Sequence, residues 1–177
     1  MEWGNRLTVD LRYAVFETEV GLVAVVGSPA GLRRVVIPHR SESGVWGLAL
    51  EGAKEAAPDS AWFVDLAERM RRYFQGQRVA FEDELDITWA TPFLRAVWEA
   101  TRHIPYGETR SYGWVARWIG RPRAVRAVGQ ALARNPLPII VPCHRVVASD
   151  GSPGGFTGGL ELKKRLLALE ARAAENA

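Results

Sequence analysis

The sole cysteine of the chain, Cys143, lies in residues 135–147, which read Asn-Pro-Leu-Pro-Ile-Ile-Val-Pro-Cys-His-Arg-Val-Val. A lone cysteine cannot form an internal disulfide, nor can it supply the several thiolates of a structural zinc site. It is therefore either a buried small apolar residue or a nucleophile. His144 offers a base and Arg145 a cation beside it, and thiol reactivity follows the thiolate fraction. We favour the nucleophile.

Length and composition limit the class of protein that could carry this thiol. The chain has 177 residues, of which 47% are hydrophobic, enough for a packed core. No uninterrupted apolar run approaches the roughly 20 residues of a membrane span. Residues 1–12 mix charged with apolar side chains and do not resemble the core of a signal peptide. We expect a cytoplasmic protein without a membrane partner, in a compartment that keeps the thiol reduced.

Charge is distributed unevenly along the chain. Residues 1–88 carry 10 Lys/Arg against 14 Asp/Glu, a net charge of −4, whereas residues 89–177 carry 13 against 6, a net charge of +7. Residues 91–136 alone hold eight arginines and two acids, Glu99 and Glu108. This pattern predicts a surface for a polyanion in the second half, with an ordinary solvated charged face as the alternative.

The first half of the chain predicts a small α/β domain over residues 1–88. Residues 11–37 contain three strand-like runs separated by turn signals at 20–21 and 28–31, which is typical of an antiparallel meander. Apolar residues then recur at helical spacing over 62–74, after a cap at Asp59 or Ser60, and Gly76 ends the helix. Residues 79–87 predict a returning strand, and nothing in this half indicates a site of its own.

The second half, residues 89–177, predicts mostly helix. Thr91 and Pro92 are suited to the cap and first position of a helix that stops before Pro105. The predicted inner face of this helix consists of Phe93, Ala96, Val97, Ala100 and Ile104. Residues 108–120 predict a short helix with a glycine stop. Residues 124–134 predict a second, arginine-rich helix with Val125 on its inner side. The pair matches a helix-turn-helix, although a plain αα-hairpin has the same signature.

Three further features bear on a site. Small residues in the arginine-rich helix, Ala127, Gly129 and Ala131, would let a ligand or DNA groove approach the backbone. Residues 148–159 form a glycine-rich loop without P-loop spacing, which suggests a wall over a planar group. Residues 160–173 predict a final helix on which Glu170 either faces solvent or points inward toward a histidine.

Residues 91–170, with the cysteine motif at their centre, closely resemble the O6-alkylguanine-DNA alkyltransferases, the methylated-DNA–protein-cysteine methyltransferases. The resemblance implies an α/β protein. Its N-terminal domain would be a small α/β unit with an antiparallel, ribonuclease H-like sheet, and its C-terminal domain would be mostly helical with a helix-turn-helix. It also implies direct-reversal repair, in which the alkyl group of O6-alkylguanine in double-stranded DNA moves irreversibly to the cysteine, once per molecule.

The same resemblance assigns the catalytic groups. Cys143 would be the nucleophile, and His144 the base that takes its proton through a water, because adjacent side chains diverge. Glu170 would orient the imidazole, following the logic of a nucleophile, base and orienting acid. Asn135 would hold the local backbone. No metal or organic cofactor is implied, and the N-terminal zinc site of some members is excluded because residues 1–142 contain no cysteine.

The DNA-binding residues follow from the resemblance too. The lesion must rotate out of the duplex, Arg126 would fill the vacated stack, and Tyr112 would donate to guanine N3 and press on the 3′ phosphate. Typical members have tyrosine and serine at positions 156 and 157, so the preference for alkyl groups is open here. The other expected DNA or pocket contacts are Ser111, Ala127, Gly129, Leu132, Pro138, Val146, Phe156 and Thr157.

Several alternatives stay open at this stage. A non-catalytic DNA-binding sensor would explain the arginines but not Cys143 and His144, and a cysteine hydrolase would not explain the arginines. We expect a monomer. The sequence leaves open whether copies cluster along DNA and whether O4-alkylthymine is also a substrate.

Overall fold

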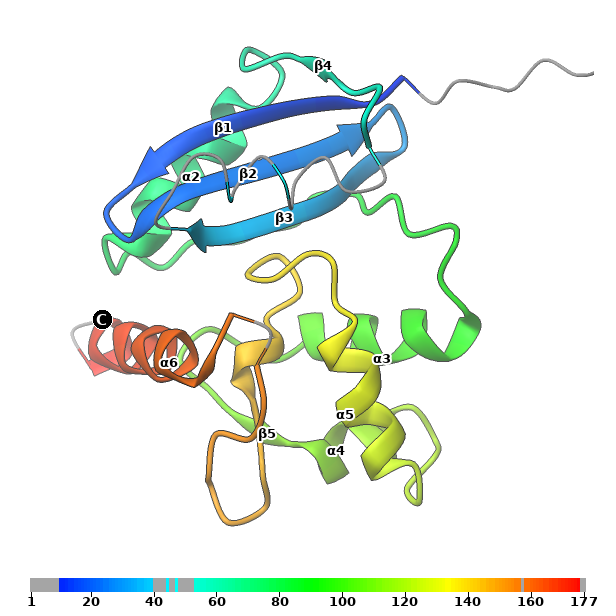
Figure 1. Cartoon of the computed structure of the whole chain (residues 1–177). Helices are drawn as coiled ribbons and strands as arrows, with labels where there is room; N and C mark the ends of the chain where they lie inside the picture. The colour runs from blue at the N-terminus through cyan, green and yellow to red at the C-terminus, as the bar shows by residue number, and fades with distance from the viewer. Residues whose placement is uncertain (1–9, 40–43, 45–46, 48–52, 157, 176–177) are drawn as a thin grey trace, which may run out of the picture.

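The computed structural model describes residues 10–39, 44, 47, 53–156 and 158–175 (Figure 1). The sheet and α2 make up the upper half of the molecule in this view, and α3 to α6 lie below them. No helix in the described ranges has both the length and the apolar character needed to cross a membrane.

The N-terminal half is built on a four-stranded sheet of order β3-β2-β1-β4. The strands β1 (Arg12–Thr18), β2 (Gly21–Ser28) and β3 (Gly31–His39) pair antiparallel, and the short β4 (Ala57–Pro58) lies parallel to β1. The predicted meander is therefore confirmed. Its two tight turns use glycines at positive φ, Gly21 at 123° and Gly31 at 130°, which residues with a Cβ rarely adopt.

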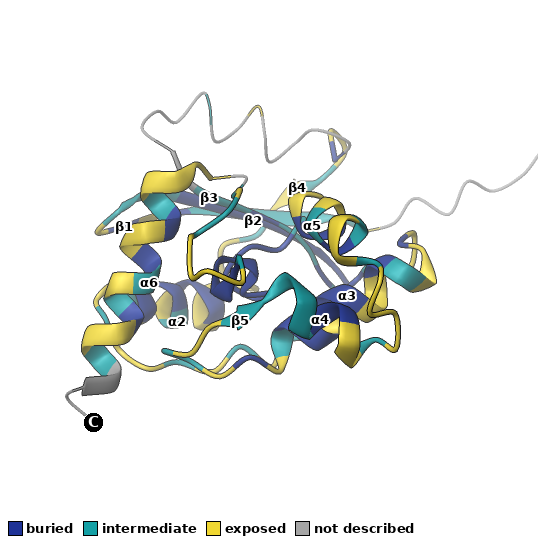
Figure 2. Cartoon of the chain, turned by 90° about the horizontal axis from the view of Figure 1, so that it is seen from below, coloured by how far each residue is buried: buried dark blue, intermediate teal, exposed yellow. Residues whose placement is uncertain are grey.

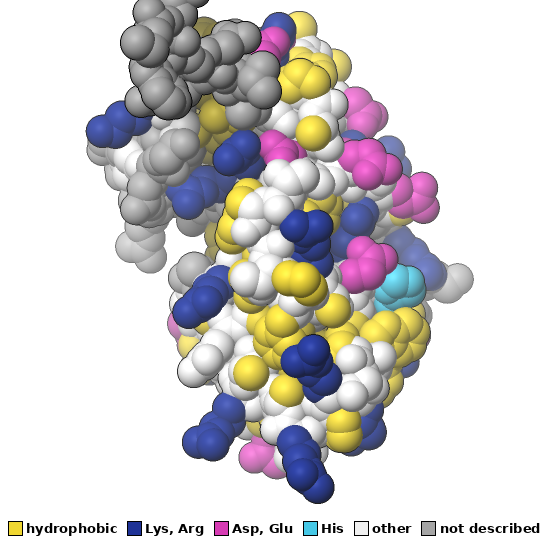
Figure 3. Space-filling view, turned by 90° about the vertical axis from the view of Figure 1, so that its right-hand side faces the viewer, with side chains coloured by type: hydrophobic (Ala, Val, Ile, Leu, Met, Phe, Trp, Pro, Cys, Tyr) yellow, Lys and Arg dark blue, Asp and Glu magenta, His cyan; other side chains and the backbone are white. Residues whose placement is uncertain are grey.

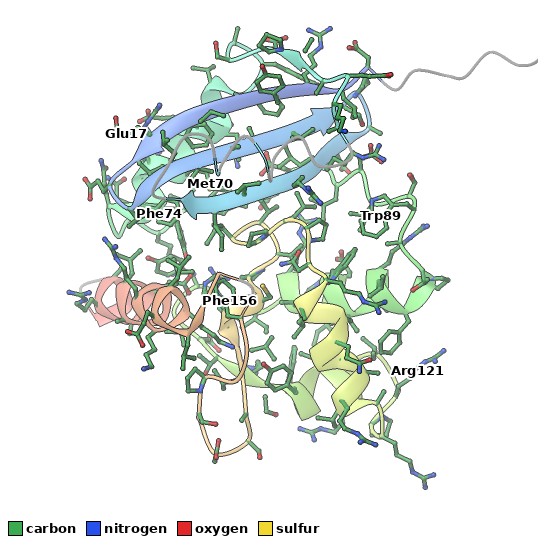
Figure 4. The ribbon with its side chains drawn as sticks, in the orientation of Figure 1. Glu17, Met70, Phe74, Trp89, Arg121 and Phe156 are labelled. Atoms are coloured by element: carbon green, nitrogen blue, oxygen red, sulfur yellow. The ribbon has the colours of Figure 1, made fainter. Side chains whose placement is uncertain are left out.

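Helix α2 (Val64–Phe74) covers one face of this sheet. Most of the predicted apolar stripe is buried, and its Met70 and Phe74 lie on the side toward the sheet (Figure 4). Trp62, by contrast, lies before the helix and is 44% exposed. The start of the helix differs from the prediction, because the carboxylate of Asp59 accepts a hydrogen bond from the Trp62 N–H at 3.0 Å and so closes a turn before the helix.

The strand predicted over residues 79–87 is wrong. Only Leu85 forms a bridge, to Leu32 of β3, where the Leu32 N–H donates to the Glu84 carbonyl and the Asp86 N–H donates to the Leu32 carbonyl, each at 2.8 Å. Two carbonyls before this point, those of Phe81 and Asp83, instead accept from the Arg102 guanidinium, each at 3.1 Å. A side chain thus satisfies backbone groups that strand pairing leaves open.

Helix α3 (Pro92–Arg102) begins as predicted, with the Thr91 hydroxyl accepting from the Leu94 N–H at 3.3 Å and proline at the first position. Its predicted inner face is largely confirmed, because Val97, Ala100 and Ile104 are buried, but Ala96 is exposed. Leu94 and Trp98 are buried in addition.

Two short helices follow, α4 (Tyr112–Trp118) and α5 (Val125–Ala133). Ser111 caps α4, and Gly120 at φ 70° ends it. The α5 helix packs against both α3 and α4, which is the arrangement expected of the helix-turn-helix.

The rest of the C-terminal half joins the two parts of the molecule. The 3-10 helix η1 (Cys143–Arg145) leads into β6 (Val146–Val147), which pairs in parallel with β5 (Arg110–Ser111), and α6 (Leu160–Glu175) packs against η1. Buried residues line the interior between the sheet and the helices (Figure 2). One hydrophobic core therefore extends from Val25 in β2 to Val97 in α3.

The turn between β2 and β3 gives a stability test. An alanine Cβ at Gly31 would overlap the backbone carbonyl of Glu84 and would also sit at φ 130°. We expect Gly31→Ala to lower the free energy of unfolding by about 3 kcal/mol or more. Gly151→Ala is the control, since Gly151 has φ 83° but open space around it, and it should cost about 1 kcal/mol. Urea unfolding measures both, and equal losses would show that the Glu84 contact does not matter.

Candidate active site

The segment that carries Cys143 is buried and tightly turned. The side chain of Cys143 is only 7% exposed, at the first position of η1. Ile139, four residues earlier, has φ 76°, a left-handed conformation that is rare for a β-branched residue and costs about 1–3 kcal/mol. The turn is closed by the Val141 N–H, which donates to the Leu137 carbonyl at 2.8 Å. The backbone is therefore held in a shape that it would not adopt alone.

Asn135 ties this segment together. Its amide nitrogen donates to the Val141 carbonyl at 2.9 Å and to the sulfur of Cys143 at 3.1 Å. Its side-chain oxygen accepts from the Leu137 N–H at 3.0 Å. A single buried amide thus bonds both to the strained turn and to the sulfur.

A buried carboxylate, Glu170 on α6, lies at the centre of the second set of contacts. It accepts hydrogen bonds from the Tyr73 hydroxyl at 2.7 Å and from the Gly107 N–H at 3.0 Å. The Arg145 guanidinium donates to both of its oxygens, at 2.8 and 3.0 Å, and His144 Nε2 lies 2.8 Å from Oε1. We call Glu170 with these four residues the Glu170 network. The inward orientation of Glu170 is therefore the one found.

The network fixes which nitrogen of His144 carries a proton. An ionised carboxylate only accepts hydrogen bonds, so the short contact to Glu170 places the proton on Nε2. Nδ1 is buried and has no hydrogen-bond partner among the described residues. In a neutral imidazole, Nδ1 is then the acceptor. The imidazole can accept a proton there while Glu170 stabilises the resulting charge.

Burial and charge set the protonation states. Burial alone would raise the pKa of Glu170, but hydrogen bonds from His144 and Arg145 and the charge of Arg145 lower it to about 2. Burial lowers the pKa of His144, against the opposing effect of Glu170, so the ring is neutral at pH 7. Burial raises the pKa of the Cys143 thiol, although the Asn135 hydrogen bond and the charge of Lys163 oppose it. Cys143 is therefore a thiol that needs a base.

Two members of this site were not predicted from the sequence. Lys163 is fully buried, and its ammonium donates to the Val146 carbonyl at 2.6 Å and the Gly155 carbonyl at 3.4 Å. Lys163 precedes Glu170 by seven residues, so the two side chains share a face of α6. This spacing could have indicated that Lys163 also faces the site if Glu170 points inward. Tyr73 belonged to an aromatic stripe that predicts core, and nothing local marked its hydroxyl.

Tyr112 lies between α5 and the glycine-rich loop. A Cβ added at Gly129 would lie 3.9 Å from the Tyr112 ring, in ordinary contact. A Cβ added at Gly154 would lie 2.7 Å from its hydroxyl, closer than real contacts allow. The Lys163 ammonium is 5.9 Å from the ring centroid. The loop therefore needs glycine at position 154, because the tyrosine occupies the space beside it.

The loop also brings Phe156 to the site. Its ring meets that of His144 edge-on, with centroids 6.5 Å apart, and it lies next to α6 (Figure 4). Thr157 lies outside the described residues. Leu132, Pro138 and Val146 are all buried.

Other expected DNA contacts lie on α5 and at the start of α4. Arg126 is exposed on α5, Ala127 is half-buried behind it, and Ser111 is occupied as the cap of α4. Lys and Arg side chains are spread over the helical half, whereas most of the acidic ones in the same view lie above them (Figure 3). Arg121 points outward at the turn between α4 and α5 (Figure 4).

Two residues of α5 lie differently from the prediction. Ala131 is buried and its carbonyl accepts from the indole N–H of Trp98 at 2.9 Å, so it faces α3 and not a groove. Val125, expected on the inner side, is 39% exposed, because it begins the helix ahead of the packed turns.

The Glu170 network generates a prediction about stability. Glu170→Gln leaves the buried Arg145 without its counter-charge, so we expect a loss of about 3–5 kcal/mol in unfolding free energy at pH 7. The folded-state pKa is about 2 against an ordinary value of 4.5. Glu170 therefore adds stability that is complete above pH 4.5 and disappears as the pH falls toward 2.

Urea unfolding of the wild type and the variant between pH 3 and pH 7 measures this. The gap between the two should narrow as the solution becomes more acidic. Glu161→Gln is the matched control on the same helix, since Glu161 is exposed, and it should change little at any pH. A constant gap would contradict the assignment of an ionised Glu170.

Comparison with known protein families covers nearly the whole chain. Residues 92–172 match the model of the 6-O-methylguanine DNA methyltransferase DNA binding domain, and residues 11–87 match that of its ribonuclease-like domain. The methylated-DNA–protein-cysteine methyltransferase of Methanosarcina acetivorans is 38% identical over 164 residues, covering 89% of this chain and 97% of the relative. That of Mycolicibacterium paratuberculosis is 50% identical over 110 residues, or 62% and 66% of the two chains.

Solved structures agree with these sequence matches. The Mycobacterium tuberculosis OGT in complex with DNA superposes with a TM-score of 0.77 at 36% identity, covering 92% of this chain and 94% of that one. An O6-methylguanine-DNA methyltransferase from Pyrococcus kodakaraensis gives a TM-score of 0.64 at 26% identity, over 90% and 98%. The predicted fold class is confirmed. On both sequence and structure, the chain belongs to the family of the O6-methylguanine-DNA methyltransferases, also called methylated-DNA–protein-cysteine methyltransferases.

Proposed function

We propose that this protein repairs alkylated DNA directly, by moving the alkyl group of O6-alkylguanine onto Cys143. The observation that carries the proposal is the buried sulfur held by Asn135, one residue from an imidazole whose Nε2 faces Glu170. Relatives are named for the same transfer, and one was solved with DNA. Together these support an enzyme that acts on DNA and uses its own cysteine as acceptor.

The proton of the thiol is the first requirement. Because burial keeps Cys143 protonated, a base must remove its proton before attack. His144 Nδ1 is the free acceptor, and a water between the two side chains would pass the proton on. The charge that forms on the imidazole lies against Glu170, which remains ionised in the buried site.

The transfer itself is a displacement at the alkyl carbon. The Cys143 sulfur forms the new C–S bond, and the electron pair of the breaking C–O6 bond passes to guanine. Tyr112 would donate a hydrogen bond to guanine N3, which makes the base a better leaving group. Burial raises the pKa of Tyr112, so its hydroxyl keeps the proton that this role needs.

Access to a base in a duplex requires that it be rotated out, at a cost of a few kcal/mol. Arg126, which is exposed on α5, would occupy the space that the base leaves, and the arginines around it suit phosphate contacts. We propose that Phe156 forms one wall of the pocket for the rotated base. Phe156 lacks the hydroxyl of the tyrosine that typical members have at this position, and this difference would affect which alkyl groups fit.

The product is a thioether on the sole cysteine of the chain, so each molecule would act once. We also propose that the chain acts as a monomer. We further propose that the chain forms two domains, residues 1–88 and 89–177. The two family matches, over residues 11–87 and 92–172, support this division.

Mass spectrometry after incubation with O6-methylguanine duplex tests the transfer. We expect one added methyl group on the Cys143 peptide and none with unmodified duplex. Cys143→Ala should bind the lesion duplex but show no transfer, because only the sulfur is lost. A wild type that binds the lesion yet stays unmodified would point to a sensor. A folded Cys143→Ala variant that no longer binds would give the cysteine a structural role instead.

Arg126→Ala tests the role of α5. We expect single-turnover transfer from duplex DNA to slow about 10- to 100-fold, since each loss of about 1.4 kcal/mol in stabilisation of the rotated base lowers the rate tenfold. Transfer from the free base O6-methylguanine should hardly change. Arg165→Ala, an exposed arginine on α6, is the charge-matched control. Equal slowing on both substrates would refute a role for Arg126 in base rotation.

A further inference from the structure

A cavity of about 500 Å³ lies between the two halves of the molecule, away from the arginine-rich helix. The extended segment 78–82 forms one side, residues 104–106 another, and the strained turn before Cys143 a third. None of its lining residues belongs to α4 or α5. It is therefore distinct from the surface proposed for DNA.

Two guanidinium groups around this cavity have uncommitted donors. Arg78 is exposed and makes no hydrogen bond or ion pair with another described residue. Arg102 uses only Nη2, toward the carbonyls of Phe81 and Asp83, which leaves Nη1 and Nε unbonded within the described ranges.

The charges favour an anion. Arg145 also lines the cavity, but both oxygens of Glu170 already neutralise it. Of the remaining lining residues, Arg78 and Arg102 are cationic and Glu82 is anionic, which leaves one net positive charge. Guanidinium groups bind phosphate and carboxylate well because their N–H groups form a planar fork.

The other walls are apolar. They come from both halves of the chain and include Val79, Phe81, Ile104, Ile139 and Pro142. An inorganic ion would leave these walls uncovered, whereas a ligand with an apolar body would bury them. The volume lies within the range of about 300–1,000 Å³ that is usual for small-molecule sites.

We infer that this cavity binds a small organic phosphate of mononucleotide size. Arg78 and Arg102 would hold the phosphate, and the body of the ligand would lie against the apolar walls. Each guanidinium fork can pair with two oxygens, so two forks suit the three terminal oxygens of a phosphate ester better than the two of a carboxylate. The ligand would border the Glu170 network from behind, since the Arg145 guanidinium stacks 5.6 Å from the centroid of the Tyr106 ring.

Isothermal titration of the full chain with adenosine 5′-monophosphate at low ionic strength tests the inference. We expect one molecule to bind per chain. Adenosine, which lacks the phosphate, and inorganic phosphate, which lacks the apolar body, should each bind at least about tenfold more weakly. Arg78→Ala should weaken binding about tenfold, as expected when a charged hydrogen bond is lost.

Arg126→Ala is the matched control and should leave the affinity for adenosine 5′-monophosphate unchanged. The inference is wrong if the wild type does not bind the nucleotide, if adenosine binds equally well, or if Arg126→Ala weakens binding and Arg78→Ala does not. The last result would place the nucleotide on the DNA surface. Methyl transfer by Arg78→Ala, measured in parallel, should equal that of the wild type, so this test is separate from that of the proposed function.

Discussion

The fold depends on one buried negative charge. A carboxylate taken out of water is costly unless cations and donors surround it. At Glu170 these come from distant parts of the chain: Tyr73 on α2, Gly107 in the loop after α3, and His144 and Arg145 beside the cysteine. Satisfying the charge therefore requires the sheet half and the helical half to be assembled correctly. The same assembly orients the imidazole, so the demands of stability and of chemistry coincide.

The sulfur is positioned by a second constraint, which is the shape of the backbone before it. Ile139 adopts a left-handed conformation, and the Asn135 amide holds the turn that contains it while also contacting Cys143. Strain of this kind persists only where the surroundings determine the backbone. Here the surroundings include β3, whose Val35 N–H donates to the Pro136 carbonyl at 2.8 Å. The sheet half thus supports the reactive segment directly, although it contributes no catalytic group.

Local patterns predicted much of this protein, and long-range contacts account for what they missed. Turn residues and alternation gave the meander, and the hydroxyl–proline pair at Thr91 gave the start of α3, because those signals act within a few residues. The segment 79–87 pairs with β3 only around Leu85, and its Phe81 and Asp83 carbonyls bond to Arg102, which is 21 and 19 residues away in the sequence. The sequence did not show whether Glu170 faces solvent or the interior, since a glutamate can occupy either the exposed or the buried face of a helix. Tyr73 lacked any signal, because its partner is 97 residues distant.

The unequal division of charge has a further consequence for how the molecule meets its target. With a net charge of −4 on residues 1–88 and +7 on residues 89–177, the protein carries a permanent electric dipole between its halves. Near a polyanion, this dipole turns the helical end forward before any contact forms. Such orienting forces fade over about 10 Å at 0.1 M salt. Ionic strength should therefore govern how often a collision is productive more than it governs the chemistry that follows.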